Sequence, residues 1–137
     1  MTSEEQQQGM RELADHYDIH LVVAFGSQVR GSAHPASDLD LAVLQRQPAE
    51  SDDPLRLIGD LQRLFPGQEV DVVWLHRADP LLAWEILQGA QLLYGDRRDL
   101  LRYQTYAWRR FVEYGRFFAL EAAAVREGIA RLRHAHR

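Results

Sequence analysis

The sequence predicts an α/β (α+β) protein with a small mixed sheet of three strands, flanking helices and a long C-terminal helix. Three short apolar segments have the composition or the alternation of strands, and segments with helical periodicity lie between them. A much longer helical pattern follows. We expect the 137 residues to form a single domain, with a core of about residues 18–95 and a C-terminal helix of about residues 96–130.

The composition excludes several classes of protein. Cysteine and lysine are both absent, and all 16 basic residues are arginine. Disulfide scaffolds, thiolate zinc sites, Walker-type P-loops and Schiff-base chemistry are therefore excluded. The net charge of −4 and the pI near 5.8 argue against bulk attraction to nucleic acid or to anionic membranes. We expect a cytoplasmic protein that binds neither nucleic acid nor membrane.

The first two predicted strands follow an N-terminal helix. Ser3 and Gln6 can form a capping box, and apolar residues then recur at helical spacing as far as Tyr17. Residues 20–25 are a short apolar run that ends at a glycine, as expected of a buried strand. Residues 38–44 alternate, so the two aspartates of this segment share one face of the sheet.

Asp-Pro pairs mark the starts of the next two helices. Asp53 and Asp79 are typical N-caps with proline in the first turn, and Pro66-Gly67 and Gly89 mark the ends. Between these helices, residues 69–75 form the third predicted strand. The apolar stripe of the helix that begins after Asp53 consists of Leu55, Ile58, Leu61, Leu64 and Phe65. The stripe of the long C-terminal helix includes Leu101, Trp108, Phe111, Gly115, Phe118, Ala122, Val125 and Ile129.

A phosphate-binding turn is predicted at the end of the first strand. Gly26 has no Cβ, so a ligand can approach its backbone closely. Ser27 occupies the N-cap position of a short helix, whose free N–H groups and dipole favour phosphate. Arg30 can reach a triphosphate or pair with a surface carboxylate. Ser37 can orient the first aspartate or the nucleotide, or it can bond to nearby backbone.

Three aspartates are candidate metal ligands. Asp38 and Asp40 project to the same side of a strand, roughly 7 Å apart at Cα. Asp71 is a single carboxylate in the otherwise apolar third strand. Three ionised carboxylates on adjacent strands would repel each other, and a divalent cation such as Mg²⁺ would remove that conflict. A phosphate-binding turn that faces such a cluster is suited to two-metal phosphoryl or nucleotidyl transfer.

These residues resemble the signature of the polymerase-β-type nucleotidyltransferase superfamily, which is Gly-Ser, about ten residues, Asp-x-Asp and a third aspartate on a later strand. The matching segments are residues 25–31, 37–43 and 69–73. The short chain is similar to the minimal nucleotidyltransferase branch, in particular to MntA-type antitoxins that are paired with HEPN toxins. That similarity continues through residues 84–94, where such proteins commonly have a helix followed by a strand.

The resemblance implies the nucleotidyltransferase fold and transfer of AMP from ATP to a tyrosine of a cognate HEPN toxin. The modified toxin would lose its ribonuclease activity. In that mechanism Asp38 and Asp40 hold two Mg²⁺ ions, and Asp71 helps to ionise the acceptor hydroxyl, as a base or through the second metal. Gly26 and Ser27 bind the β- and γ-phosphates. A hetero-oligomer with the toxin is the implied assembly.

Other interpretations remain open from the sequence alone. The same chemistry could act on a small molecule such as an aminoglycoside, although enzymes of that kind usually have an additional substrate domain. A non-catalytic antitoxin could neutralise its toxin by occlusion, through the aromatic residues of the last helix. A purely structural α/β module is the third possibility, with Gly26 in a simple turn and Asp38 and Asp40 on a solvated strand face.

Overall fold

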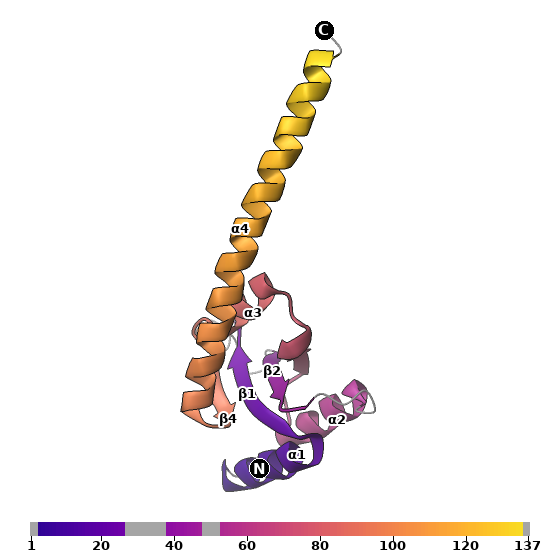
Figure 1. Cartoon of the computed structure of the whole chain (residues 1–137). Helices are drawn as coiled ribbons and strands as arrows, with labels where there is room; N and C mark the ends of the chain where they lie inside the picture. Colours follow the sequence, from indigo (N-terminus) through magenta and orange to yellow (C-terminus); the bar gives the residue numbers. More distant parts are fainter. Residues whose placement is uncertain (1–2, 27–37, 48–52, 136–137) are drawn as a thin grey trace.

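The computed structural model describes residues 3–26, 38–47 and 53–135 (Figure 1). In chain order the elements are α1 (Ser3–Tyr17), β1 (Ile19–Phe25), β2 (Leu39–Gln45), α2 (Pro54–Leu64), β3 (Val70–Trp74), the 3₁₀ helix η1 (Leu75–Arg77), α3 (Pro80–Leu87), β4 (Gln91–Tyr94) and α4 (Arg97–Ala135). Strands and helices are interleaved, which confirms the predicted α/β class.

The strands form one mixed sheet in the order β3-β2-β1-β4. β1 is antiparallel to β2 and β4, and β2 is parallel to β3. The predicted mixed sheet is confirmed, but the predicted count of three strands is wrong. β4 has only four residues, none of them β-branched, so its own sequence carries little strand signal. It is a strand because it pairs with residues 22–24 of β1.

An apolar cluster covers each face of the sheet. On one face, alternate residues of β2 pack against α1 and α2, with Leu41 and Val43 fully buried. On the other face, Val23 and Ala42 pack against η1, α3 and α4. The alternation in residues 38–44 therefore assigns its leucines at 39 and 41 to the first cluster and leaves the aspartates on the second face.

The two predicted Asp-Pro helix starts are confirmed. Asp53 accepts a hydrogen bond from the backbone N–H of Leu55 at 3.0 Å, and Asp79 accepts one from Leu82 at 2.8 Å. The predicted stripe of α2 is partly wrong, because Leu55 is 77% exposed. The helix instead turns Leu57, Leu61 and Leu64 inward, at i, i+4 and i+7.

α4 runs along the sheet and then continues past it (Figure 1). In its first turn, Asp99 lies 3.5 Å from His20 of β1, measured between Oδ2 and Nε2. Leu100 and Ala107 are buried against the sheet, whereas Leu101 and Trp108 of the predicted stripe are about half exposed. The face that covers the sheet is therefore shifted by one residue from the predicted one. Within the described part of the chain, no helix combines the length and apolar character needed to cross a membrane.

Candidate active site

Two of the three predicted aspartates are direct neighbours in the sheet. Asp40 of β2 is the register partner of Asp71 of β3, and Asp38 comes immediately before β2. The next residues on the same face, Ala42 and Val73, belong to the cluster beneath α3 and α4. The sheet therefore brings the carboxylates of Asp40 and Asp71 together at one end of this cluster.

The backbone of Gly26 lies against the carboxylate of Asp40. β1 ends at Phe25, which is the register partner of Asp40, and Gly26 then adopts a φ of +84°. A Cβ at Gly26 would stand 2.6 Å from Asp40 Oδ2, too close for a real contact. Glycine therefore serves two purposes here: it permits the positive φ, and it keeps the carboxylate oxygen accessible.

The pKa of Asp40 is raised by its surroundings in the cluster. Burial raises the pKa of this carboxyl above its usual 3.8, and the negative charges of Asp71 and then Asp38 raise it further. Each of these effects disfavours the ionised form. A positive charge bound among the three carboxylates would relieve the repulsion and favour the ionised form of Asp40.

The donor set fits Mg²⁺ that arrives with a nucleotide. Within residues 3–26, 38–47 and 53–135, no three His, Cys, Asp or Glu side chains form a metal site on their own. Mg²⁺ usually takes only one or two carboxylates from a protein and completes its shell with phosphate oxygens and water. Asp40 beside Asp71 supplies that number of carboxylates, and Gly26 places no side chain of its own against Asp40 Oδ2.

Three predicted nucleotide-binding residues lie outside the part that the structure describes. These are Ser27, Arg30 and Ser37, all in the segment that joins β1 to β2. Their roles remain predictions. The described residues that flank this segment, Gly26 after β1 and Asp38 before β2, both lie at the end of the strands where the carboxylates are found.

Aromatic side chains of α3 and α4 cover the same face of the sheet. Trp84 stacks on Phe111 with ring centroids 5.9 Å apart. The hydroxyl of Tyr103 donates to the carbonyl of Leu75 at 3.5 Å, and burial is the main cause that raises its pKa. A raised pKa keeps the hydroxyl protonated, so that it can donate this hydrogen bond to the backbone of η1.

Sequence reasoning missed Gln62, which holds the start of β3. Its Oε1 accepts from the N–H of Val70 at 3.0 Å, and its Nε2 donates to the carbonyls of Phe65 and Gln68. These bonds fix the turn between α2 and the strand that carries Asp71. The available signal was a polar residue beside buried Leu61, one turn before Pro66-Gly67.

Comparisons with known proteins agree with this geometry. The profile of the family described as polymerase beta, nucleotidyltransferase matches residues 8–99, which is more than half of the chain. A search among curated proteins finds no significant match.

Several solved structures share the fold. A chain of a toxin–antitoxin complex with AMP-PNP is 22% identical, with a TM-score of 0.66 over 90% of this chain and 98% of that one. A chain of an MntA–HepT toxin–antitoxin complex is 19% identical, with a TM-score of 0.62 over 93% and 99%. A chain of the complex of tri-AMPylated Shewanella oneidensis HEPN toxin with MNT antitoxin is 19% identical, with a TM-score of 0.60 over 93% of this chain and 99% of that one.

The extent of the family match and the placement of Gly26, Asp40 and Asp71 lead to one assignment. The chain belongs to the polymerase beta nucleotidyltransferase family.

Proposed function

We propose that the protein is an antitoxin-type adenylyltransferase that transfers AMP from ATP to a tyrosine of a cognate HEPN ribonuclease toxin. The observation that carries the proposal is the contact of Gly26 with Asp40 beside Asp71, a site suited to a nucleotide and its metal. The toxin–antitoxin complexes with the same fold, one with AMP-PNP and one with a tri-AMPylated toxin, support the choice of nucleotide and acceptor.

The reaction is a displacement at the α-phosphorus of ATP. The tyrosine oxygen forms a bond to this phosphorus, and the bond to the β-phosphate oxygen breaks, so pyrophosphate leaves. The phenolic proton has to be removed, because a tyrosine with a pKa near 10 is protonated at neutral pH. Asp71 assists this removal, either as the base or through a metal ion, and Gly26 and Ser27 bind the β- and γ-phosphates.

Two Mg²⁺ ions held by Asp38, Asp40 and Asp71 would neutralise charge on the phosphates and on the attacking oxygen. Arg30 and Ser37 would complete the nucleotide site from the segment between β1 and β2. The chain would act in the cytoplasm as one nucleotidyltransferase domain in a hetero-oligomer with the toxin. No contact of its own with nucleic acid or membrane is needed.

The test uses the purified protein, the candidate toxin (a helical protein, sought in the neighbouring reading frame), ATP and Mg²⁺. Intact-mass spectrometry of the helical protein is expected to show one or more added AMP units on tyrosine. Asp38→Asn should abolish this addition, because the substitution removes a charge that offsets the metal while it hardly changes volume. An unchanged partner mass, together with full protection of cells by Asp38→Asn, would instead establish an antitoxin that acts by occlusion.

A substitution of Asp71 tests nucleotide binding and the chemical step separately. Asp71→Asn leaves the backbone of Gly26 and the carboxylate of Asp40 in place, so ATP should bind within several-fold of the wild-type affinity. Transfer should fall by roughly 100-fold or more, the usual scale for loss of a positioned base. Calorimetry measures the binding and mass spectrometry the transfer. Unchanged transfer would show that Asp71 has only a structural role.

A small-molecule acceptor such as an aminoglycoside is the alternative within the same chemistry. Incubation with radiolabelled ATP and a panel of aminoglycosides distinguishes the two acceptors. Label on the drug and none on the helical protein would reject the antitoxin proposal.

A further inference from the structure

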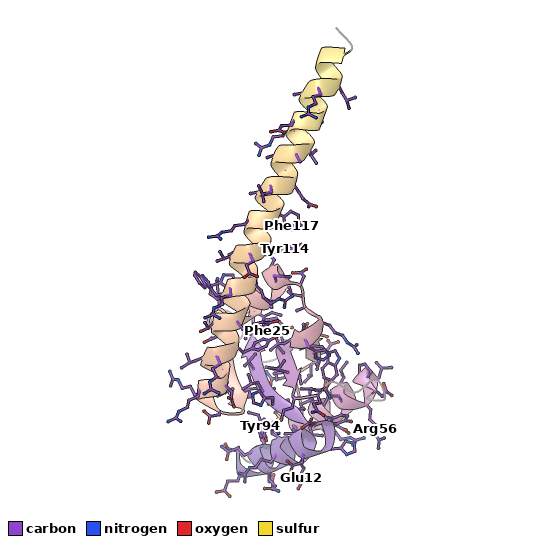
Figure 2. All side chains as sticks on the ribbon, viewed as in Figure 1. Glu12, Phe25, Arg56, Tyr94, Tyr114 and Phe117 are labelled. Carbon is purple, nitrogen blue, oxygen red and sulfur yellow. The ribbon has the colours of Figure 1, made fainter. Side chains whose placement is uncertain are left out.

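The distal part of α4, residues 118–135, is here called the arm. Five large apolar side chains of the arm are between 44% and 72% exposed. Leu120 lies on one side of the helix, and the other four share the opposite face: Phe118, Val125, Ile129 and Leu132. Exposed apolar side chains that gather on one face in this way mark an interaction site. Figure 2 shows the arm's side chains extending into solvent beyond Tyr114 and Phe117.

The exposed stripe continues the face of α4 that packs on the body of the protein. Eighteen residues make five turns of an α-helix, so residues 18 apart point in the same direction. Leu100 and Ala107 are buried against the sheet, Phe111 stacks on Trp84, and Tyr114 is half-buried. Each recurs 18 positions later as a large apolar residue of the arm, in the order Phe118, Val125, Ile129 and Leu132.

The stripe of the arm lies on the same side of the sheet as the carboxylates, beyond the strand end that carries them. α4 begins beside His20 at the start of β1, through Asp99, and runs in the direction of that strand (Figure 1). From His20 to Gly26 the strand rises about 20 Å, a distance that α4 covers in about 13 residues. The arm therefore begins beyond the level of Gly26, on the same side of the sheet as Asp40. A molecule packed on its stripe lies next to the candidate active site.

We propose that the arm is the docking surface for the acceptor protein, and that its occupant is a helical surface with an acidic rim. The proposal rests on the proposed function and adds to it the place where the acceptor binds. Ala122 lies between Phe118 and Val125, so the stripe has the alternating four- and three-residue spacing of helices that pack against other helices. Phe117, which is 56% exposed, widens the apolar surface on one side of the stripe.

The charge of the arm indicates an acidic partner and not a second copy of this chain. The arm contains three arginines and two glutamates, and with Arg116 just before it residues 116–135 carry a net charge of +2, in a protein whose net charge is −4. Two such arms side by side would repel each other, whereas an acidic helical surface is complementary. A partner that spans several helices can also cover Phe117, which lies beside the seam that a single second helix would fill.

The test compares two double variants of the full-length protein with the same change in charge. Val125→Glu with Ile129→Glu places two carboxylates in the stripe, and Ala123→Glu with Ala130→Glu places two on the opposite side of the same helix turns. All four positions are exposed, so neither variant disturbs the packed body. The stripe variant should bind the helical toxin at least tenfold more weakly and should show an equal loss of kcat/KM for AMP transfer. Saturating toxin should restore its kcat, because docking residues do not take part in the chemical step.

Each further outcome has a separate meaning. ATP with Mg²⁺ should raise the melting temperature of both variants as it does that of the wild type. Equal toxin binding and equal kcat/KM in both variants would overturn the docking proposal and leave the proposed function intact. Stripe-dependent binding without any AMP transfer by the wild type would retain the docking surface and reject the enzymatic function. A wild-type homodimer that the stripe variant converts to monomers would assign the arm to self-association and overturn the proposal.

Discussion

At the scale of single residues, Gly26 links a backbone conformation to the chemistry of the site. Both Gly26 and Gly67 have a positive φ, +84° and +88°. A Cβ at Gly26 would press on the Asp40 carboxylate, whereas a Cβ at Gly67 would meet nothing within 4 Å. Alanine at either position should therefore lower the free energy of unfolding by about 1–2 kcal/mol, the cost of a left-handed conformation. Only Gly26→Ala should also abolish AMP transfer.

Gly67→Ala is thus the matched control for backbone strain. Urea denaturation measures the stability of the two variants, and intact-mass spectrometry measures transfer. If Gly26→Ala retained wild-type transfer at the same loss of stability as Gly67→Ala, the close approach to Asp40 would have no catalytic importance.

Asp40 should cost the protein stability when neither metal nor nucleotide is bound. Its pKa is raised in the folded state, so the folded protein holds this proton to higher pH than the unfolded chain does. The free energy of unfolding therefore falls as pH rises from the ordinary pKa of 3.8 through the raised one, and the penalty is complete above that window. Asp40→Asn removes the penalty and should melt at a higher temperature than the wild type at neutral pH.

Thermal melts without ligand, from neutral pH down to below 3.8, test this expectation. The difference between Asp40→Asn and the wild type should disappear at the acidic end, where Asp40 is protonated in both states. ATP with Mg²⁺ should reverse the order at neutral pH, because only the wild type gains binding energy. A variant that is less stable than the wild type at neutral pH without ligand would show that repulsion does not dominate at Asp40.

At the scale of elements, one side chain of α2 sets the position of β3. Gln62 bonds to the backbone of Phe65, Gln68 and Val70. Gln62→Ala leaves these partly buried groups without their partner and should lower the free energy of unfolding by about 1–3 kcal/mol. Transfer should fall as well, because Asp71 follows Val70 directly.

Gln8→Ala is the corresponding control, because within the described residues the side chain of Gln8 donates to the exposed side chain of Glu12, at 3.3 Å. Its cost should stay within about 0.5 kcal/mol. Urea denaturation of the two variants side by side gives both values. An equal cost for the two substitutions would show that Gln62 does not anchor the strand.

The elements differ in how far the sequence could predict them. Asp53 and Asp79 act through hydrogen bonds two or three residues away, so local sequence is enough to locate the helices that they cap. β4 could not be derived in this way, because its strand conformation depends on pairing with β1, about 70 residues earlier in the chain. The outward direction of Leu55 likewise depends on where the sheet lies.

In the candidate site, too, some features follow from local sequence and others depend on how the strands pair. The alternation of residues 38–44 was enough to place Asp38 and Asp40 on one face of their strand, and the lone carboxylate of the third strand was enough to single out Asp71. The direct pairing of Asp40 with Asp71 depends on strand order and register, which the local pattern does not contain. The contact between Gly26 and Asp40 Oδ2 likewise exists only once β1 and β2 have paired.

At the scale of the whole molecule, the body and the arm of α4 divide the proposed work. The body carries Gly26 and the three carboxylates, and the arm, which extends past the body (Figure 1), has an exposed apolar face. From the whole molecule we expect a difference in stoichiometry between an enzyme and an occluding antitoxin. An enzyme releases each modified toxin and acts again, whereas an occluding antitoxin remains on the toxin that it inhibits.

We therefore expect neutralisation at far less than one molecule of this protein per molecule of toxin. Turnover numbers of about 1–10³ per second are common, so a hundredfold excess of toxin should be modified within minutes when ATP and Mg²⁺ are present. A ribonuclease assay of the toxin across a series of molar ratios measures this directly. Toxin separated from the protein afterwards should stay inactive, since AMP is covalently attached, and Asp38→Asn should inhibit at most in equimolar amounts. If the wild type also needs equimolar amounts, and if the separated toxin regains its activity, inhibition comes from the complex itself and the arm alone accounts for it.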